Sequence, residues 1–218
     1  MGTHAPSDPL SGLAAFLRGL VIAVCCAIVL GLHVRTFVVQ AFVVVSPSMT
    51  DTLWIGDHVV VDKLSFSAVG VGLPGGAVRR GDLVLIDRRY AHDTKNVIKR
   101  CVATAGETVE IIGTTLYVDD VAIDDWVRGQ PGGGSFPRSR VPADHLFVLG
   151  DNRAESRDSR DWGFVPVDAV RGRPRLVYLS LASTRPDTLD DWSKIPNRSF
   201  TSRWSGRIRW HRMLRVVN

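Results

Sequence analysis

The most extended feature of the hydrophobic pattern is an uncharged stretch near the start of the chain. Gly19–Leu32 carries no charge, and apolar residues on both sides extend it to the about 20 residues that a membrane-spanning helix needs. Arg18 and His33 stand near its ends, where their side chains can reach the lipid headgroups. The pattern predicts a membrane anchor over residues 13–35.

A cleavable signal peptide is the alternative interpretation of this stretch. The region before it is long and weakly charged, and no small-x-small site follows Leu32 before the next apolar run. Both observations favour an uncleaved anchor. Arg18 and Arg35 flank the stretch almost symmetrically, so charge leaves the orientation of the anchor open.

The pattern changes to short β-type runs after Arg35. These runs are rich in Val, Ile, Leu and Tyr, and Gly, Pro or Asp separates them, which predicts a mostly antiparallel β domain. Loops are expected at Gly70–Gly76 and Gln130–Ser139, the second within an insertion, Thr108–Asp144. The expected strands are Val59–Lys63, Leu83–Asp87, Asn96–Ala103, Thr108–Ile112, Thr115–Val118, Leu146–Leu149 and Arg175–Leu181.

Composition narrows the class of protein. An apolar fraction of 45% excludes a disordered chain, and three Cys, two of them adjacent in the apolar stretch, exclude a disulfide scaffold. Cys101 is expected to be a buried core residue. The net charge is +5, and the segment from Ser193 onward has seven Lys and Arg, two Trp and no acidic residue. Beside a membrane anchor, this basic segment favours a lipid surface over nucleic acid.

Four short patterns follow one another along the β region. They are Ser46–Leu53, the turn Arg80-Gly81-Asp82, the strand Val97–Val102 with Lys99 inside it, and the run Gly150–Pro166 (GDNRAESRDSRDWGFVP). Taken singly, each is typical of an ordinary turn, strand or solvated loop. Strand alternation places Lys99 opposite Ile98 and Arg100.

Together, in this order, the four patterns resemble the type I signal peptidases, which are membrane-anchored Ser/Lys endoproteases that remove signal peptides from exported proteins. The resemblance implies that Ser48 is the nucleophile, Lys99 the general base, and Ser46 an oxyanion-hole partner of the Ser48 N–H. It also implies site-supporting roles and a set of substrate-pocket residues. The supporting residues would be Ser156, Asp158 and Arg160, and the pocket would be lined by Phe42, Val44, Val45, Leu53 and Ile98.

The same resemblance implies the fold class and the location. The fold would be mostly β, an antiparallel β-sheet catalytic domain with a small β-hairpin insertion, preceded by one N-terminal transmembrane helix. The protein would be a single-pass cell-membrane protein with its catalytic domain on the extracytoplasmic side. Its partners would be the signal peptides of exported preproteins and the lipid bilayer, and not nucleic acid. No cofactor would be needed. The expected segments are a tail (1–12), the anchor (13–35), the catalytic domain (36–107 and 145–183), the insertion (108–144) and an irregular basic segment (184–218).

The chain departs from the family pattern at three places. Pro47 replaces the frequent Gly, Asp51 replaces the usual Pro, and residues 103–107 (ATAGE) replace Gly-Leu-Pro-Gly-Asp. None of these positions carries a side chain that the resemblance assigns to catalysis.

The chemistry of a Ser/Lys dyad is compatible with these residues. Lysine accepts a proton only when it is neutral, so its pKa must fall from about 10.4 toward about 8, a change that burial in an apolar wall can supply. Val97, Ile98 and Val102 are the expected wall. A Ser-His-Asp triad would have to use His58, His92 or His145, none of which lies in a triad motif, and no His/Cys/Asp cluster has metal-ligand spacing.

Two further functions remain as alternatives. One is a peptidase dedicated to a single substrate, of the conjugation-pilin or spore type, which the departures at Pro47 and Asp51 keep open. The other is a catalytically silent, membrane-tethered β module that binds peptide or lipid. The presence of all four expected site residues argues against the silent module, namely Ser46, Ser48, Lys99 and Ser156.

Overall fold

The computed structural model describes residues 9–66, 76–87, 89–90, 96–123, 134–182 and 208–217, with side chains from residue 12 onward. The chain forms two compact units, Met1–Val38 and Val39–Asn218.

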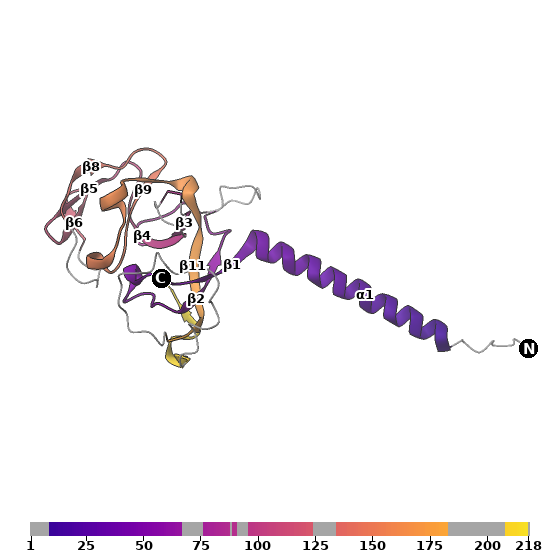
Figure 1. Cartoon of the computed structure of the whole chain (residues 1–218). Helices are drawn as coiled ribbons and strands as arrows, with labels where there is room; N and C mark the ends of the chain where they lie inside the picture. The colour runs from indigo at the N-terminus through magenta and orange to yellow at the C-terminus, as the bar shows by residue number, and fades with distance from the viewer. Residues whose placement is uncertain are drawn as a thin grey trace, which may run out of the picture. The chain divides into compact units, whose positions relative to one another are not determined.

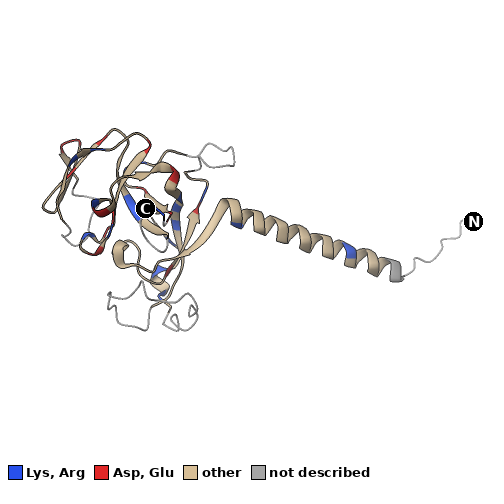
Figure 2. Cartoon of the chain, turned by 45° about the horizontal axis from the view of Figure 1, so that its top comes forward, with Lys and Arg blue, Asp and Glu red and all other residues tan. Residues whose placement is uncertain are grey.

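The first unit is a single apolar helix. Helix α1 (Pro9–His33) continues into a π-helical segment, η1 (Val34–Val38), and the expected anchor lies inside this continuous element. The 27 residues Gly12–Val38 are long and apolar enough to cross a membrane by length and composition. Figure 2 shows how few charged residues lie along it.

The second unit is built on an eight-stranded antiparallel sheet (Figure 1). Its order is β1-β2-β11-β3-β4-β9-β10, and β12 pairs with β11. The mostly antiparallel β fold predicted from the sequence is therefore confirmed. The strands are β1 (Val39–Val43), β2 (Asp57–Asp62), β3 (Leu83–Ile86), β4 (Val97–Thr104), β9 (His145–Leu149), β10 (Val165–Pro166), β11 (Val170–Ser180) and β12 (Arg215–Val216).

A smaller four-stranded sheet, of order β7-β6-β5-β8, lies between β4 and β9 in the sequence. Its strands are β5 (Thr108–Ile112), β6 (Thr115–Val118), β7 (Val121–Ala122) and β8 (Phe136–Arg140).

Strand β8 corrects one prediction. The loop expected over Gln130–Ser139 is wrong from Phe136 onward, because Phe136 packs 4.7 Å, centroid to centroid, from Phe147 and begins a strand that pairs with β5. Pro137 is tolerated there because β8 is an edge strand, where a missing N–H costs no ladder bond. Gly134 and Ser135 are in no helix or strand, as expected for a loop. Residues 130–133, and the loop at Gly70–Gly76 apart from Gly76, lie outside the described residues.

Strand β11 connects the two halves of the large sheet. Its first residues pair with β3 and the residues from Arg173 onward pair with β2. The crossing requires Gly172, since a Cβ atom there would lie 2.6 Å from the carbonyl oxygen of Asp62. β11 begins at Val170, five residues earlier than expected, and pairing continues through Pro174 with the help of a bulge.

Short helical turns lie between several strands of the large sheet. They are η2 (Pro47–Met49), η3 (Arg153–Glu155), α2 (Ser159–Trp162), η4 (Val167–Ala169) and η6 (Trp210–Arg212). An irregular segment was expected over 184–218, but η6 and β12 give residues 210–212 and 215–216 regular structure. Buried Arg212 fixes this part of the chain. Residues 183–207 lie outside the described residues.

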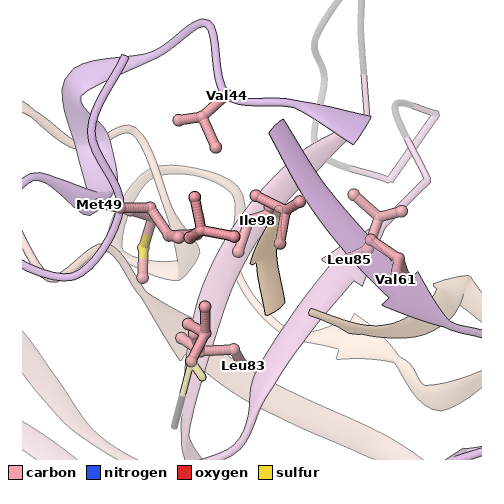
Figure 3. Packing of buried hydrophobic residues seen from close by; sticks show 10 residues of the cluster. Val44, Met49, Val61, Leu83, Leu85 and Ile98 are labelled. Carbon is pink, nitrogen blue, oxygen red and sulfur yellow. The ribbon is translucent and has the colours of Figure 1, made fainter. Parts of the chain in front are cut away.

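Three apolar clusters form the core of the second unit. One of them brings strands β2, β3, β4 and β11 together with the loop that carries Ser48 (Figure 3). Cys101 is fully buried, as expected, and burial raises the pKa of its thiol to about 12. The members of the first cluster are Val44, Met49, Leu53, Val59, Val61, Leu83, Leu85, Ile98, Val177 and Val217.

Candidate active site

Ser48 lies in a tight turn between β1 and β2, which we call the Ser48 turn (residues 46–53). Ser46 caps η2, since its Oγ accepts a hydrogen bond from the Ser48 N–H at 3.3 Å. Pro47 occupies the first helical position, where its fixed φ suits the turn and its missing N–H has no partner to lose. The Thr50 N–H and hydroxyl both donate to the Pro47 carbonyl, at 2.9 and 2.6 Å. The departure at Pro47 is thus compatible with this turn.

Asp51, the second departure, adopts a left-handed backbone conformation with φ 90°. Proline has its φ fixed near −65°, so this conformation cannot hold the Pro that is usual in the family pattern. Asp and Asn enter the left-handed region more readily than other residues with a side chain. The sequence and the local backbone therefore agree at this position.

The loop that follows β9 binds the Ser48 turn through hydrogen bonds from Asn152. The Asn152 N–H donates to the Ser48 carbonyl at 3.1 Å, and its Nδ2 donates to the Pro47 carbonyl at 3.3 Å. Asn152 therefore holds the carbonyls of two successive residues of the turn. Gly150 is in still closer contact, because a Cβ built there would lie 2.5 Å from the Ser48 carbonyl oxygen and 2.2 Å from Ser156 Oγ.

Lys99 reaches the same loop from strand β4. Its side chain is 2% exposed, and its Nζ donates to Ser156 Oγ at 2.8 Å. The Ser156 hydroxyl in turn donates to Asp158 Oδ2 at 2.6 Å. Since Gly150 contacts both Ser156 and the Ser48 turn, the lysine amine and the candidate nucleophile belong to one continuous cluster.

Asp158 is fully buried at the start of α2 and is matched by Arg160. The guanidinium contacts both carboxylate oxygens, at 2.8 and 2.9 Å, and also donates to the carbonyls of Arg153 and Ser156. Burial alone would raise the pKa of the Asp158 carboxyl. Hydrogen bonds and charge from Arg160, with the Gly150 N–H and the Ser156 hydroxyl, outweigh burial and hold that pKa below its usual range.

A second buried ion pair, between Arg100 and Asp151, lies next to this cluster. Arg100 directly follows Lys99 in β4. Arg100 binds both oxygens of Asp151, at 2.8 and 2.7 Å, and donates to the Gly81 carbonyl at 2.8 Å. Thr52 of the Ser48 turn donates to the same carboxylate at 2.5 Å. The turn at Gly81 is thus connected to the Ser48 turn through these charged groups. A removal of either charge would leave its buried partner uncompensated.

Four of the five expected pocket residues share one apolar cluster. Val44, Leu53 and Ile98 are buried together with Met49, and Phe42 packs against them. Figure 3 shows Met49 and Ile98 close together in this cluster. Val45 is half-buried and is not part of it.

The apolar wall that was expected around Lys99, formed by Val97, Ile98 and Val102, is divided among three clusters. Ile98 lies in this first cluster, Val97 packs against a second cluster and Val102 belongs to a third. Alternation separates Val97 from Ile98, and a bulge between Cys101 and Ala103 changes the register before the strand ends. The three residues therefore do not form one continuous surface.

The histidines form no triad in the described residues. The His58 ring is buried beside Tyr178, 5.9 Å between centroids, and its Nδ1 lies 3.1 Å from the Gly56 carbonyl. His145 contacts the Ala143 carbonyl at 2.8 Å. His92 lies outside the described residues.

Sequence reasoning did not single out Gly150, Asn152 or Arg153. All three belong to the GDNR run. Gly150 and Asn152 contact the distant Ser48 turn, which no local pattern reveals, whereas the Arg153 side chain donates to the Gly150 carbonyl. Arg153 is buried, and burial together with the charge of Arg160 lowers its pKa to about 10. The density of polar residues directly after a hydrophobic strand was the only signal available.

Comparison with known proteins gives one consistent result. The family model described as "Signal peptidase, peptidase S26" matches residues 17–179. A signal peptidase I of Leptolyngbya laminosa is 33% identical over 153 residues, covering 67% of this chain and 72% of that protein. A signal peptidase I of Bacillus caldolyticus is 31% identical over 171 residues, covering 72% of this chain and 86% of that protein. A solved signal peptidase I from Enterococcus faecalis has 30% identity and a TM-score of 0.38, over 45% of this chain and 97% of that one. The family model and the sequence relatives show that the chain is a serine endopeptidase and belongs to the signal peptidase family, peptidase S26.

Proposed function

We propose that this protein is a membrane-anchored endopeptidase that removes signal peptides with a Ser48/Lys99 dyad. One observation carries the proposal: buried Lys99 donates to Ser156, whose Oγ lies against the same glycine, Gly150, as the Ser48 carbonyl. Burial disfavours the charged ammonium form, and only a neutral amine can take a proton from a serine hydroxyl.

The hydrogen bonds around Ser156 indicate how the amine would be oriented. The Ser156 hydroxyl donates its hydrogen bond to Asp158, so its oxygen is available to accept a hydrogen bond from a Lys99 N–H. A neutral amine has two N–H groups and one lone pair, so fixing an N–H restricts the direction of the lone pair. We expect the lone pair to take the Ser48 proton during attack on the scissile carbonyl, and the resulting ammonium to protonate the leaving amine.

Arg160 has an electrostatic part in this scheme. The Asp158 carboxylate lies one hydroxyl away from Lys99, and alone it would stabilise the ammonium form. Arg160 neutralises it by contacting both oxygens. Asp158 can therefore orient Ser156 without holding Lys99 in its charged form.

The oxyanion would be held by the Ser48 N–H and the Ser46 hydroxyl. Their donor atoms are 3.3 Å apart, so both can reach a single oxygen atom. In the free protein the N–H donates to the Ser46 oxygen instead. Substrate binding would replace that bond with two bonds to the developing negative charge.

Substrate choice would follow from the apolar surroundings of Ser48. Phe42, Val44, Val45, Leu53 and Ile98 offer no charge, so a charged residue beside the scissile bond would be desolvated without a partner. The substrate would add as an extended strand, with small residues such as Ala one and three positions before the cut. The apolar helix α1 would hold the enzyme in the membrane that contains the substrate's own apolar segment, with the catalytic unit on the extracytoplasmic side.

Cleavage of a secretory preprotein in detergent, with the cut mapped by mass spectrometry, tests the proposal. Ser48→Ala and Lys99→Ala should each abolish cleavage, because members of a dyad act as a unit. Lys63→Ala is the matched control and should keep nearly full activity. A folded Lys99→Ala variant that still turns over would refute the dyad.

A cleavage-site library tests the pocket separately. The wild type should cut after Ala-x-Ala, and Ile98→Ala should relax the choice toward larger side chains by about 1–3 kcal/mol. A wild-type preference for Lys, Arg or Phe directly before the cut would contradict the pocket assignment.

A further inference from the structure

The C-terminal residues 208–217, here called the C-terminal clasp, form part of the catalytic unit although the family match ends at residue 179. Strand β12 pairs with β11, and the Leu214 N–H donates to the Val177 carbonyl at 2.7 Å. The Arg209 N–H donates to the Ser180 carbonyl at 2.9 Å. These bonds fix the clasp along the C-terminal half of β11, on the edge opposite β2.

The clasp places one arginine in the protein interior. Arg212 is 2% exposed, and it binds fully buried Asp57, with Nη2 2.6 Å from Oδ2. Burial alone would raise the pKa of Asp57, but hydrogen bonds from Arg212, Ser180 and the Trp54 N–H hold it below its usual range. Asp57 is therefore a carboxylate, and Arg212 balances its charge.

The same guanidinium also contacts the Ser48 turn. Its Nη2 donates to the Thr52 carbonyl at 3.2 Å, and its Cζ lies 4.1 Å from the centroid of the Trp54 ring. The N–H groups of Thr52 and Leu53 donate to the Met49 carbonyl, at 3.1 and 2.8 Å, directly after Ser48. Thr52, which binds the buried Arg212, is therefore separated from the candidate nucleophile Ser48 by only three residues.

We infer that Arg212 is a positioning residue for catalysis: it fixes the Ser48 turn through the Thr52 carbonyl and the Trp54–Asp57 turn. This inference rests on the proposed role of Ser48. Asn152 holds the beginning of the turn and Arg212 holds its end, so Ser48 lies between two fixed points. Arginine suits this role because its planar fork contacts Asp57 and a carbonyl at the same time, whereas a lysine ammonium is a point charge.

The test uses the full chain in detergent micelles with two substitutions that avoid an unpaired buried charge. Arg212→Lys keeps the positive charge but loses the fork. The double variant Asp57→Asn with Arg212→Met removes both charges. The Asn oxygen can still accept from the Trp54 N–H, and the Asn Nδ2 can donate to the Ser180 hydroxyl oxygen. Arg215→Met, an exposed arginine of the same segment, is the matched control. Kinetics on a preprotein peptide and thermal unfolding are measured for each.

A positioning role predicts a split between kcat and KM. A displacement of the nucleophile by about 1 Å costs up to about 100-fold in rate, so kcat should fall about 10- to 100-fold while KM stays within about twofold. Arg215→Met should match the wild type in both. A folded Arg212→Lys or double variant with wild-type kcat would overturn the inference. So would failure of both variants to fold, since Arg212 would then serve stability alone.

Ser48→Ala separates this inference from the proposed function. If Ser48→Ala is inactive and Arg212→Lys is fully active, only the positioning role is wrong. If Ser48→Ala is active, the proposed function fails and the inference fails with it.

Discussion

Gly150→Ala is the smallest change that should separate Ser48 from Ser156, two groups of the proposed active site. The added methyl would lie 2.2 Å from Ser156 Oγ and 2.5 Å from the Ser48 carbonyl oxygen, where ordinary contacts are 3.4–4 Å. Relief requires the loop or the Ser48 turn to move by more than about 1 Å, since close-packed atoms cannot absorb such an overlap. The carbonyl belongs to the backbone and cannot rotate away. We therefore expect both Ser156 and Ser48 to shift.

Two magnitudes follow from this overlap. Overpacking of this kind costs about 1–3 kcal/mol of stability. A misplacement of about 1 Å at the reacting groups costs about 100-fold in rate. Because the apolar pocket residues are not touched, KM should change little.

Steady-state cleavage of a peptide that spans a signal-peptide junction gives kcat and KM, and urea unfolding followed by tryptophan fluorescence gives stability. Gly76→Ala is the control, since its added methyl would lie at an ordinary 3.5 Å from the Ser65 carbonyl. Wild-type kcat in Gly150→Ala would refute the reasoning that Ser156 and the Ser48 turn are held against each other. A rise in KM at constant kcat would refute it as well.

Three other outcomes are expected. If neutral Lys99 is the base, kcat/KM rises with pH along a limb above the about 6.5 of a histidine, and a limb near 6.5 in a peptide assay would contradict the dyad. Because Arg160 and its neighbours hold the pKa of Asp158 below its usual range, the contribution of this carboxylate to stability is full above about pH 4 and is lost as the pH falls toward the lowered value. Asp158→Asn should therefore show a smaller loss of stability than the wild type between pH 6 and pH 3 in urea titrations, and an equal loss would count against the pairing. Asp51→Pro should lower stability by about 1–3 kcal/mol because φ 90° is closed to proline, whereas Asp51→Asn should be nearly neutral in the same titration.

The sequence predicted the elements better than the contacts between them. Alternation and turn residues were sufficient for strands such as Thr108–Ile112 and Thr115–Val118, whose bounds are those expected, because a hairpin is a local structure. Phe136–Arg140 was missed because its Gly-rich approach and Pro137 are typical of a loop. The strand forms because Phe136 packs on Phe147, and such a tertiary contact cannot be predicted from the local pattern.

The candidate site shows the same limit. Ser48, Lys99 and Ser156 could be chosen because each lies in a pattern that resembles a family. Gly150 could not, because its role depends on how closely the Ser48 backbone approaches it. Arg212 could not either, since a basic C-terminal segment normally indicates a solvated surface, and only its partner Asp57, 155 positions away, makes it a buried residue.

These separations have a consequence for when the protein becomes active. The pairs that assemble the site are 57 residues apart for Lys99 and Ser156, 99 for Thr52 and Asp151, and 155 for Asp57 and Arg212. Contacts this distant form late, because the entropy of closing long loops must be overcome before they stabilise anything. During synthesis, the last of these contacts also has to wait for the C-terminal residues to emerge. If these contacts support catalysis as proposed, the protease gains its activity only after the chain that it could cleave has folded.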